Sequence, residues 1–152
     1  MEVKVKKLNP KATLPSYQTE HAAAMDVHAC IDEPMILQPL ERAMVPTGLA
    51  FEIPEGYEMQ VRARSGLSIK HGITMVNGVG TIDADYRGEL NILVINLGQD
   101  AFEIEPNMRI AQLLVTKYDK VSWQLTESLS ETDRGSGGFG STGIQQPIDK
   151  EA

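Results

Sequence analysis

Hydrophobic and polar residues alternate along much of the chain, which is the pattern of half-buried β-strands. The odd positions from Tyr57 to Ala63 are apolar, whereas the even positions from Glu58 to Arg64 are charged or polar. Apolar runs bounded by Pro, Gly, Asn and Asp predict further strands at 24–30, 42–45, 49–53, 90–97 and 109–116. Many short strands separated by turn residues are typical of an all-β sandwich or jelly roll.

Two segments depart from simple alternation. Residues 65–71 follow a strand and begin with serine, so they are predicted to form a short helix. In residues 90–97, apolar side chains occupy both odd-numbered and even-numbered positions. They therefore predict either a central strand covered on both faces or a strand at a subunit interface.

The composition changes at Ser128, after which Ser, Thr, Gly, Asp and Glu dominate. This part cannot build a core, so the chain is predicted to divide into a β domain, 1–127, and a flexible Gly-rich C-terminal arm, 128–152. Phe139 stands alone within the glycine run 134–143. A simple linker has no need of that aromatic ring.

Length and charge exclude several classes of protein. A chain of 152 residues with 41% hydrophobic residues supports one domain with a core. The formal net charge of -7 repels polyanions, which argues against nucleic-acid binding. The single cysteine, Cys30, cannot form an internal disulfide, and no stretch has the length of a signal peptide core or a membrane span. We expect a soluble cytoplasmic protein.

The glycine run has the composition of a phosphate-binding loop. Glycines let backbone N–H groups converge on an anion, Arg134 offers a guanidinium, and Ser141 offers a hydroxyl. The Phe139 ring could stack on a nucleobase. The run lacks the lysine of a P-loop, so an ordinary P-loop NTPase is rejected, and the combination indicates a nucleotide.

Two further segments carry polar groups at predicted turns. Asn77-Gly78 predicts a tight hairpin, followed by Asp83 and Asp85, which are explained either as turn residues or as reactive carboxylates. Arg64-Ser65-Gly66 ends a strand where the predicted helix begins, a place that favours an anion.

Five segments in order resemble the five motifs of the trimeric deoxyuridine triphosphate nucleotidohydrolases (dUTPases). They are residues 22–29, 64–68, 77–89, 107–113 and 134–143. The third and fifth are the most specific. Ala24 and Met25 differ from the residues usual in the first motif, but Asp26 is in place.

The resemblance implies a single distorted β jelly roll of the β-clip type, assembled as a homotrimer. Each active site would be built from three chains, with the arm of one subunit closing over a site formed by its neighbours. The implied reaction is Mg²⁺-dependent hydrolysis of dUTP to dUMP and pyrophosphate by attack of water at the α-phosphorus. Such an enzyme limits uracil incorporation into DNA and supplies dUMP for thymidylate synthesis.

The resemblance also implies a role for each motif residue. Asp83 would activate the attacking water, and Asp26 would bind Mg²⁺ through a water molecule. Arg109 would stabilise the site or the trimer. The implied substrate contacts are Arg64, Ser65, Gly66 and Gln112 on the phosphates, Asn77, Gly80, Thr81 and Ile82 on uracil, Tyr86 on the deoxyribose, Asn91 as a weaker contact, and Arg134, Phe139, Gly140 and Ser141 from the arm.

Two alternatives remain open. A dCTP deaminase shares the fold but uses a glutamate five residues after the hairpin glycine, where this chain has Leu93 after Gly88. A non-catalytic nucleotide-binding jelly-roll protein would be expected to lack Asp83 or Phe139, and this chain has both.

Overall fold

The structure is a computed structural model that describes residues 1–143. The chain forms two compact units, Met1–Asp119 and Lys120–Ala152, and the second is described as far as Gly143. The division into 1–127 and 128–152 stays a prediction, and residues 144–152 of the predicted arm lie outside the described residues.

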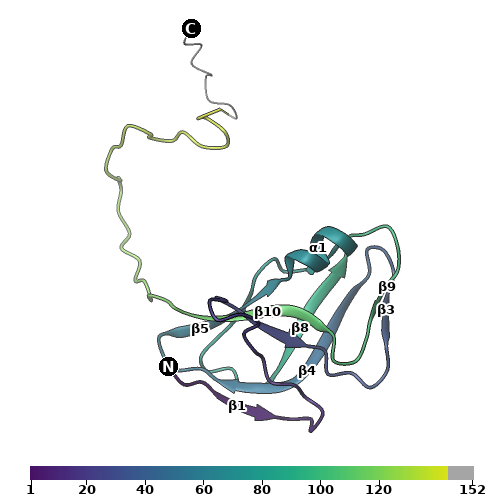
Figure 1. The fold of residues 1–152 in the computed structure, drawn as a ribbon. Helices are drawn as coiled ribbons and strands as arrows, with labels where there is room; N and C mark the ends of the chain where they lie inside the picture. Colours follow the sequence, from purple (N-terminus) through teal and green to yellow (C-terminus); the bar gives the residue numbers. More distant parts are fainter. Residues whose placement is uncertain (144–152) are drawn as a thin grey trace. The chain divides into compact units, whose positions relative to one another are not determined.

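The first unit is built of β-strands and one short helix, as predicted (Figure 1). The strands are β1 (Lys4–Lys7), β2 (Met25–His28), β3 (Met35–Leu37), β4 (Arg42–Glu52), β5 (Tyr57–Ala63), β6 (Ile73–Met75), β7 (Gly80–Ile82), β8 (Glu89–Asn96), β9 (Phe102–Ile104) and β10 (Arg109–Lys117). The predicted helix is confirmed as α1 (Ser65–His71). None of the helical segments within residues 1–143 has the length and apolar character needed to cross a membrane.

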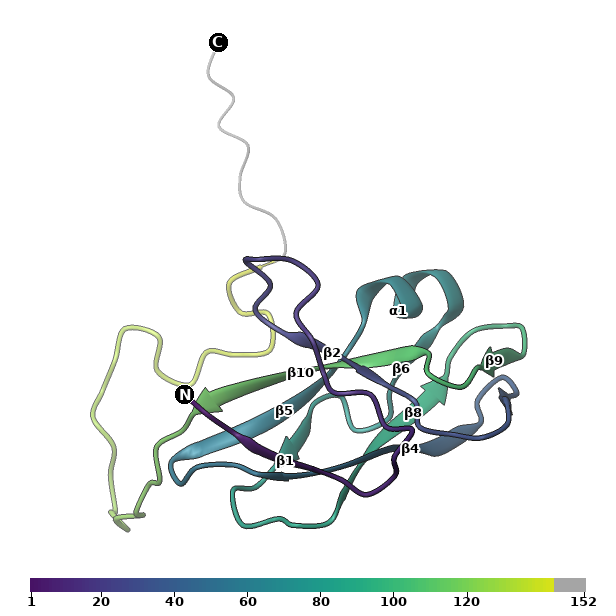
Figure 2. The ribbon, with the colours of Figure 1, turned by 60° about the horizontal axis from the view of Figure 1, so that its bottom comes forward.

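Two four-stranded antiparallel sheets enclose the core (Figure 2). Their strand orders are β1-β4-β8-β6 and β2-β10-β5-β7, and β3 pairs with β9 in a small third sheet. One cluster of buried side chains joins the sheets, with Val45 and Ile92 from the first and Val61 and Leu113 from the second. Residues that point away from this cluster lie on the outer face of their sheet.

The segments 42–45 and 49–53 were expected to be separate strands, and this expectation was wrong. They form one strand, β4, whose pairing with β8 shifts register between Pro46 and Ala50. Gly48 lies at the shift with φ of +68°, and a side chain there would lie 2.8 Å from the Sγ atom of Cys30. The bulge therefore absorbs the interruption without ending the strand.

The prediction of a tight hairpin at Asn77-Gly78 was also wrong. β6 and β8 are antiparallel neighbours, but residues 76–88 connect them, and within this connection β7 pairs with β5 of the other sheet. The Asn77-Gly78 turn is real, because Gly78 has φ of +71° and its N–H donates to the carbonyl of Met75. The turn carries the chain from one sheet to the other instead of reversing it within a sheet.

Residues 90–97 were predicted to form either a central strand covered on both faces or a strand at a subunit interface, and within one chain β8 is not covered on both faces. Leu90, Ile92, Val94 and Asn96 are buried, whereas the residues between them are only partly buried. The strand is central in its sheet, but only one face is covered by the core. Its outer apolar side chains remain accessible in the single chain.

Candidate active site

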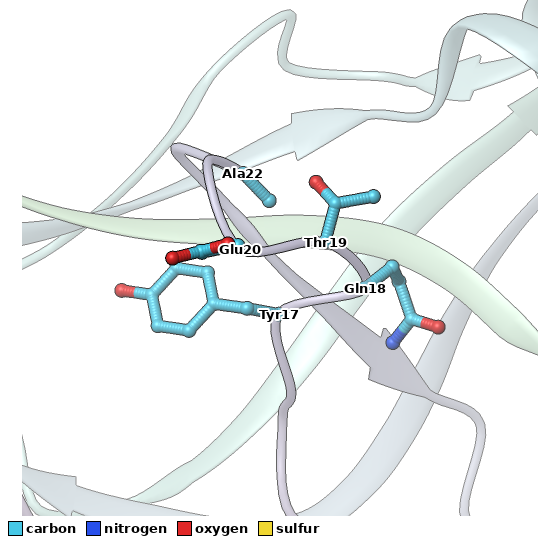
Figure 3. A pocket seen from close by; sticks show the side chains of 5 residues that line it. All are labelled: Tyr17, Gln18, Thr19, Glu20 and Ala22. Carbon is cyan, nitrogen blue, oxygen red and sulfur yellow. The ribbon is translucent and has the colours of Figure 1, made fainter.

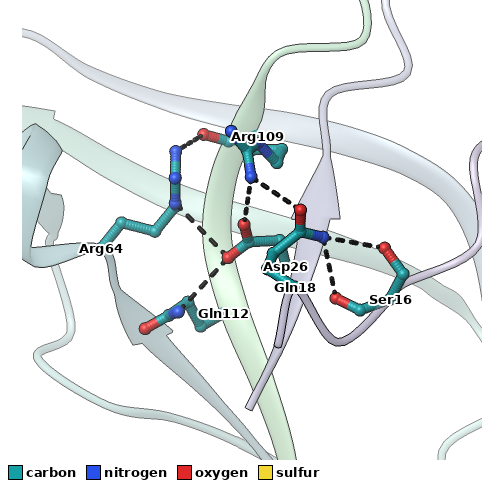
Figure 4. Close-up of polar contacts among 6 residues, drawn as sticks. All are labelled: Ser16, Gln18, Asp26, Arg64, Arg109 and Gln112. Atoms are coloured by element: carbon teal, nitrogen blue, oxygen red, sulfur yellow. Dashed lines mark hydrogen bonds and ion pairs between the residues drawn. The ribbon is translucent and has the colours of Figure 1, made fainter. Parts of the chain in front are cut away.

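The carboxylate of Asp26 is the centre of a polar cluster (Figure 4). Asp26 is on β2 and only 3% exposed. Its Oδ2 accepts a hydrogen bond from Nη1 of Arg109 at 3.0 Å, and its Oδ1 accepts one from Nε2 of Gln112 at 3.3 Å. Nε of Arg64 lies 3.4 Å from the same Oδ1. A buried carboxylate is thus balanced by two arginines and an amide.

Further contacts fix the two arginines in place (Figure 4). Arg64 donates from Nη1 to the carbonyl oxygen of Arg109 at 2.8 Å. Arg109 donates to Oε1 of Gln18 at 2.9 Å, and Gln18 in turn donates to the carbonyl and hydroxyl oxygens of Ser16. Arg64 is held through two nitrogens, Nη1 and Nε, and Arg109 makes both of its contacts through Nη1, so both side chains are oriented before any ligand arrives.

Strand register explains why residues distant in sequence meet here. Gln112 on β10 pairs with Asp26 on β2 and with Arg62 on β5. Directly opposed residues in antiparallel strands point to the same face. On β5, Gln60 shares that face with Arg62, and Gln60 pairs with Thr81 on β7. The outer face of this sheet therefore carries a row of polar side chains from β2 to β7.

The turns on either side of β7 carry exposed functional groups. Asn77 lies before the strand, Asp83 and Tyr86 lie after it, and all three are exposed. The N–H of Tyr86 donates to the carbonyl of Asp83 at 3.2 Å, and the Tyr86 hydroxyl donates to the carbonyl of Glu89 at 3.0 Å. Asp83 and Tyr86 are thus joined by one turn that leads into β8.

Gly80 and Ile82 have their places set by β7. Gly80 is buried opposite Val61, and a Cβ atom there would lie 3.4 Å from Nδ2 of Asn77. The same Cβ would lie 3.1 Å from Cβ of Val61, so the glycine chiefly leaves room for the Val61 side chain, with the Asn77 amide nearby. Ile82 is opposite Met59 and packs against the core.

Ser65 and Gly66 follow Arg64 as the first two residues of α1 and are exposed. Asn91 is elsewhere. It is on β8 opposite Pro46, on the outer face of the other sheet, and donates from Nδ2 to the carbonyl of Glu89 at 3.2 Å. One chain therefore brings Asp26, Arg64 and Gln112 together, but it leaves Asn91 on the opposite outer face.

The glycine run in the second unit is a series of tight turns. The N–H groups of Gly135, Gly137, Ser141 and Gly143 each donate to the carbonyl three residues earlier. Nε of Arg134 donates to the carbonyl of Gly137 at 2.8 Å. Phe139 and Gly140 both have positive φ values, and the Phe139 side chain is fully exposed. The turns present this ring to solvent.

The arginines also shape the charge around His28. Burial of the imidazole lowers its pKa most, the positive charge of Arg109 lowers it further, Asp26 raises it by less than Arg109 lowers it, and Arg64 adds the smallest lowering. A histidine with a lowered pKa is neutral at pH 7. The fixed positive charge near β2 therefore comes from the arginines.

Asp26 has capacity for one more contact. An ionised carboxylate has about four acceptor positions. Arg109, Gln112 and Arg64 occupy three of them. Within residues 1–143 there is no group of three His, Cys, Asp or Glu side chains placed to hold a metal. These residues fit a metal ion that keeps its own waters, with Asp26 bonded to one of them, and do not fit an all-protein cage.

A pocket of about 540 Å³ lies in the loop before β2, lined by Tyr17, Gln18, Thr19, Glu20 and Ala22 (Figure 3). None of the predicted substrate contacts lines it. Gln18 links the pocket to the Asp26 cluster through its side chain, and Ser16, just before the pocket residues, pairs with the Asp26 backbone. Gln18 could not be predicted from the sequence, because an isolated polar residue in a loop has no periodicity or motif to mark it.

The family comparison covers nearly the whole chain. Residues 10–143 match the family model described as dUTPase. The chain is a member of the dUTPase family, as its motifs predicted.

Two curated relatives and one solved structure illustrate the similarity. The chain is 52% identical to the deoxyuridine 5'-triphosphate nucleotidohydrolase of Rickettsia felis, over 94% of this chain and 97% of the relative. It is 51% identical to the protein of that name from Orientia tsutsugamushi, over 95% and 100%. The dUTPase of Staphylococcus bacteriophage 80alpha, solved with dUPNHPP, has 29% identity and a TM-score of 0.85, over 94% and 99% of the two chains.

Proposed function

We propose that this chain is a dUTP diphosphatase that hydrolyses dUTP to dUMP and pyrophosphate. The observation that carries the proposal is 52% identity over 94% of the chain to a deoxyuridine 5'-triphosphate nucleotidohydrolase. The Asp26 cluster supports it, because it supplies oriented cationic groups on the outer face of a rigid sheet. The product dUMP feeds thymidylate synthesis, and removal of dUTP limits uracil incorporation into DNA.

Arg64, Ser65, Gly66 and Gln112 contact the triphosphate in this proposal. Arg64 is held by Asp26 and by the carbonyl of Arg109 and still has unused guanidinium N–H groups. A donor fixed in this way stabilises developing charge without first reorganising. Arg109 has a different role, because its contacts with Asp26 and Gln18 make it a positioning residue.

Magnesium is the proposed metal. Mg²⁺ supplies charge neutralisation on the triphosphate, is held mainly by phosphate oxygens and water, and contacts Asp26 through one of those waters. The single acceptor position left on the Asp26 carboxylate supports this arrangement.

Asp83 is the proposed base for the attacking water. Its carboxylate is exposed and is linked through one turn to Tyr86. Attack at the α-phosphorus requires a water held in line, and a carboxylate can orient it and accept its proton. Tyr86 lies against the deoxyribose in this proposal and excludes a ribose 2′-hydroxyl.

Asn77, Gly80, Thr81 and Ile82 read the uracil edge with side-chain and main-chain groups. The Asn77 amide lies beside Gly80, the first residue of β7, which supports a compact recognition edge there. A site of buried hydrogen-bonding groups rejects a mismatched base by about 10⁴-fold or more.

The assembly we propose is a homotrimer with shared active sites. An apolar patch lies on the outer face of β4 and β8, where Met44 is opposite Leu93, and it extends to Val76 just after β6, whose N–H donates to the Leu93 carbonyl. Met44 is 62% exposed and Val76 41% exposed. Contiguous apolar surface of this kind marks an interface, and an obligate one resembles a core. Light scattering should give three times the 16.7 kDa of the chain.

The arm completes the site in this proposal. Arg134, Gly140 and Ser141 contact the phosphates, and Phe139 stacks on uracil. The full exposure of the Phe139 ring supports this role, because an exposed aromatic side chain gains from stacking on a base. Asn91 contributes its weaker contact from a neighbouring copy, which accounts for its position on the opposite face. We assign the reaction to the cytoplasm, since Cys30 is a free thiol.

Pyrophosphate release from dUTP, dTTP, dCTP and UTP with Mg²⁺ tests the reaction and its specificity together. We expect release from dUTP far above the other three. Ammonia release from dCTP would instead identify a deaminase, and binding of dUTP without turnover would identify a non-catalytic protein. Leu93 opposes deaminase chemistry, because it is an apolar residue on the outer face of β8.

A further inference from the structure

Gly88 is a glycine that the backbone does not require. Its φ lies outside the left-handed region, so an alanine could adopt the same backbone conformation. The residue is exposed and lies between the proposed sugar contact Tyr86 and the start of β8. The backbone conformation therefore does not explain the glycine, and the side chain packed over it can.

The Tyr86 side chain covers Gly88. A Cβ atom on Gly88 would lie 2.5 Å from Cζ and 2.9 Å from Cε2 of Tyr86 and would also overlap the hydroxyl oxygen. Carbon atoms do not approach so closely without one of them moving. The three nearest atoms to such a Cβ all belong to Tyr86.

A hydrogen bond holds the ring in this position. The Tyr86 hydroxyl donates to the carbonyl oxygen of Glu89 at 3.0 Å. The same oxygen accepts a hydrogen bond from Nδ2 of Asn91 at 3.2 Å. Glu89 is itself anchored, because its Oε1 accepts the N–H of Gly48 at 2.8 Å. One carbonyl thus orients two of the proposed substrate contacts.

We propose that Gly88 is a specificity-determining residue that acts by seating the Tyr86 ring. This inference rests on the proposed function, in which Tyr86 excludes the ribose 2′-hydroxyl. A ring that lies directly over a glycine has a fixed height above the backbone, and Tyr86 as a residue remains 46% exposed. A methyl group at position 88 displaces the ring and breaks its bond to Glu89, so the sugar-facing surface is no longer in a defined place.

Steady-state kinetics with dUTP and UTP test the proposal in four proteins: the natural chain, Gly88→Ala, Tyr86→Ala and the double variant. We expect Gly88→Ala to lower the preference for dUTP over UTP by about tenfold. Because the alanine acts through the ring, it should change nothing further once the ring is removed, so the double variant should match Tyr86→Ala. An unchanged preference in Gly88→Ala, or additive effects in the double variant, would overturn the role in specificity.

Fluorine NMR with 3-fluorotyrosine tests the seat apart from the reaction. The chain has four tyrosines, and the signal lost in Tyr86→Phe assigns Tyr86. In Gly88→Ala we expect that signal alone to shift. No shift overturns the seat whatever the substrate is. A shift in a protein that does not hydrolyse dUTP leaves the seat standing and refutes the proposed function instead.

If Gly88→Ala folds poorly, melting temperatures test the same proposal. Removing the ring opens the space above residue 88, so the double variant should then recover the melting temperature of Tyr86→Ala. Failure of the double variant to fold as well as Tyr86→Ala would show that the methyl group clashes with something other than the ring, and the proposal would be wrong.

Discussion

The Asp26 cluster and the glycine run at 134–143 are proposed to meet the same triphosphate, yet they are organised in opposite ways. The cluster joins residues more than 80 positions apart, and strand register holds it together. The run is closed by hydrogen bonds that span only three residues. Loss of the cluster should therefore disturb both stability and activity, whereas loss of the run should disturb activity alone.

Asp83→Asn should give the largest effect, because it removes the base and leaves both of these regions intact. We expect turnover to fall by about 10²–10⁴-fold, the usual contribution of a positioned acid or base, while dUTP still binds. Pyrophosphate release measures turnover, and calorimetry with a non-hydrolysable analogue measures binding. The matched control is Asp85→Asn, two residues away, which should keep its activity. Equal losses in both variants would contradict the assignment.

Deletion of 134–152 tests the glycine run directly. We expect kcat/KM for dUTP to fall by about 100-fold, since the site loses donors that orient the substrate. The melting temperature should not change, because the described turns of this run are closed within themselves. Unchanged kcat/KM would show that the arm has no part in the mechanism. A lower melting temperature would show that the glycine run contributes to stability, as the Asp26 cluster does.

Asp26→Ala tests the other region. Arg64 and Arg109 lose their shared acceptor, and breaking a buried ion pair costs about 3–5 kcal/mol. We expect about 2 kcal/mol here, because both arginine side chains are partly exposed to solvent. Thermal melting at fixed protein concentration measures the loss. The control is Asp32→Ala, which removes an exposed pair with Lys11 and should leave the melting temperature unchanged. Similar melting of the two variants would contradict the structural role of the cluster.

Phe139→Ala isolates one side chain of the glycine run. Stacking of an aromatic ring on a base contributes about 1–3 kcal/mol, so we expect kcat/KM to fall by roughly 10–100-fold with no change in melting. Phe139→Tyr keeps the ring and should retain most of the activity. Loss of activity in both variants would point to something other than stacking.

Gln18→Ala should give the smallest effect. It removes one hydrogen bond to Arg109, which is worth about 1 kcal/mol, and we expect roughly a fivefold fall in kcat/KM. Thr19→Ala changes the same pocket without touching that bond and serves as the control. If Gln18→Ala has normal kinetics, Arg109 is held well enough by Asp26 alone.

The sequence predicted the parts of this molecule that depend on local pattern. Alternation located β5, an apolar run bounded by turn residues located β10, and α1 was predicted to the residue. The five motifs alone identified the family that the family model confirms. The prediction of two strands on either side of Gly48 failed for a physical reason. A glycine in a sequence indicates a turn, but it forms a β-bulge when the residues around it stay paired with the neighbouring strand.

What could not be predicted depends on register and on crossing between sheets. No local pattern indicates that β7 pairs with β5 and not with β6 or β8, its neighbours in sequence. The contacts of Asp26 with Arg64 and Arg109 likewise follow from tertiary pairing, and Gln18 lies outside every motif. The motifs indicated which residues matter, and the structure assigned positioning roles to Arg109 and Gln18.

Activity of mixed trimers tests the central claim that the site is shared between copies. Asp83→Asn and the 134–152 deletion variant should each be nearly inactive alone. If the base and the arm of one site come from different copies, a mixture refolded in equal amounts should regain activity at about a quarter of its sites. A mixture that stays as inactive as its parts would show that each site takes its base and its arm from a single chain, which would contradict the account.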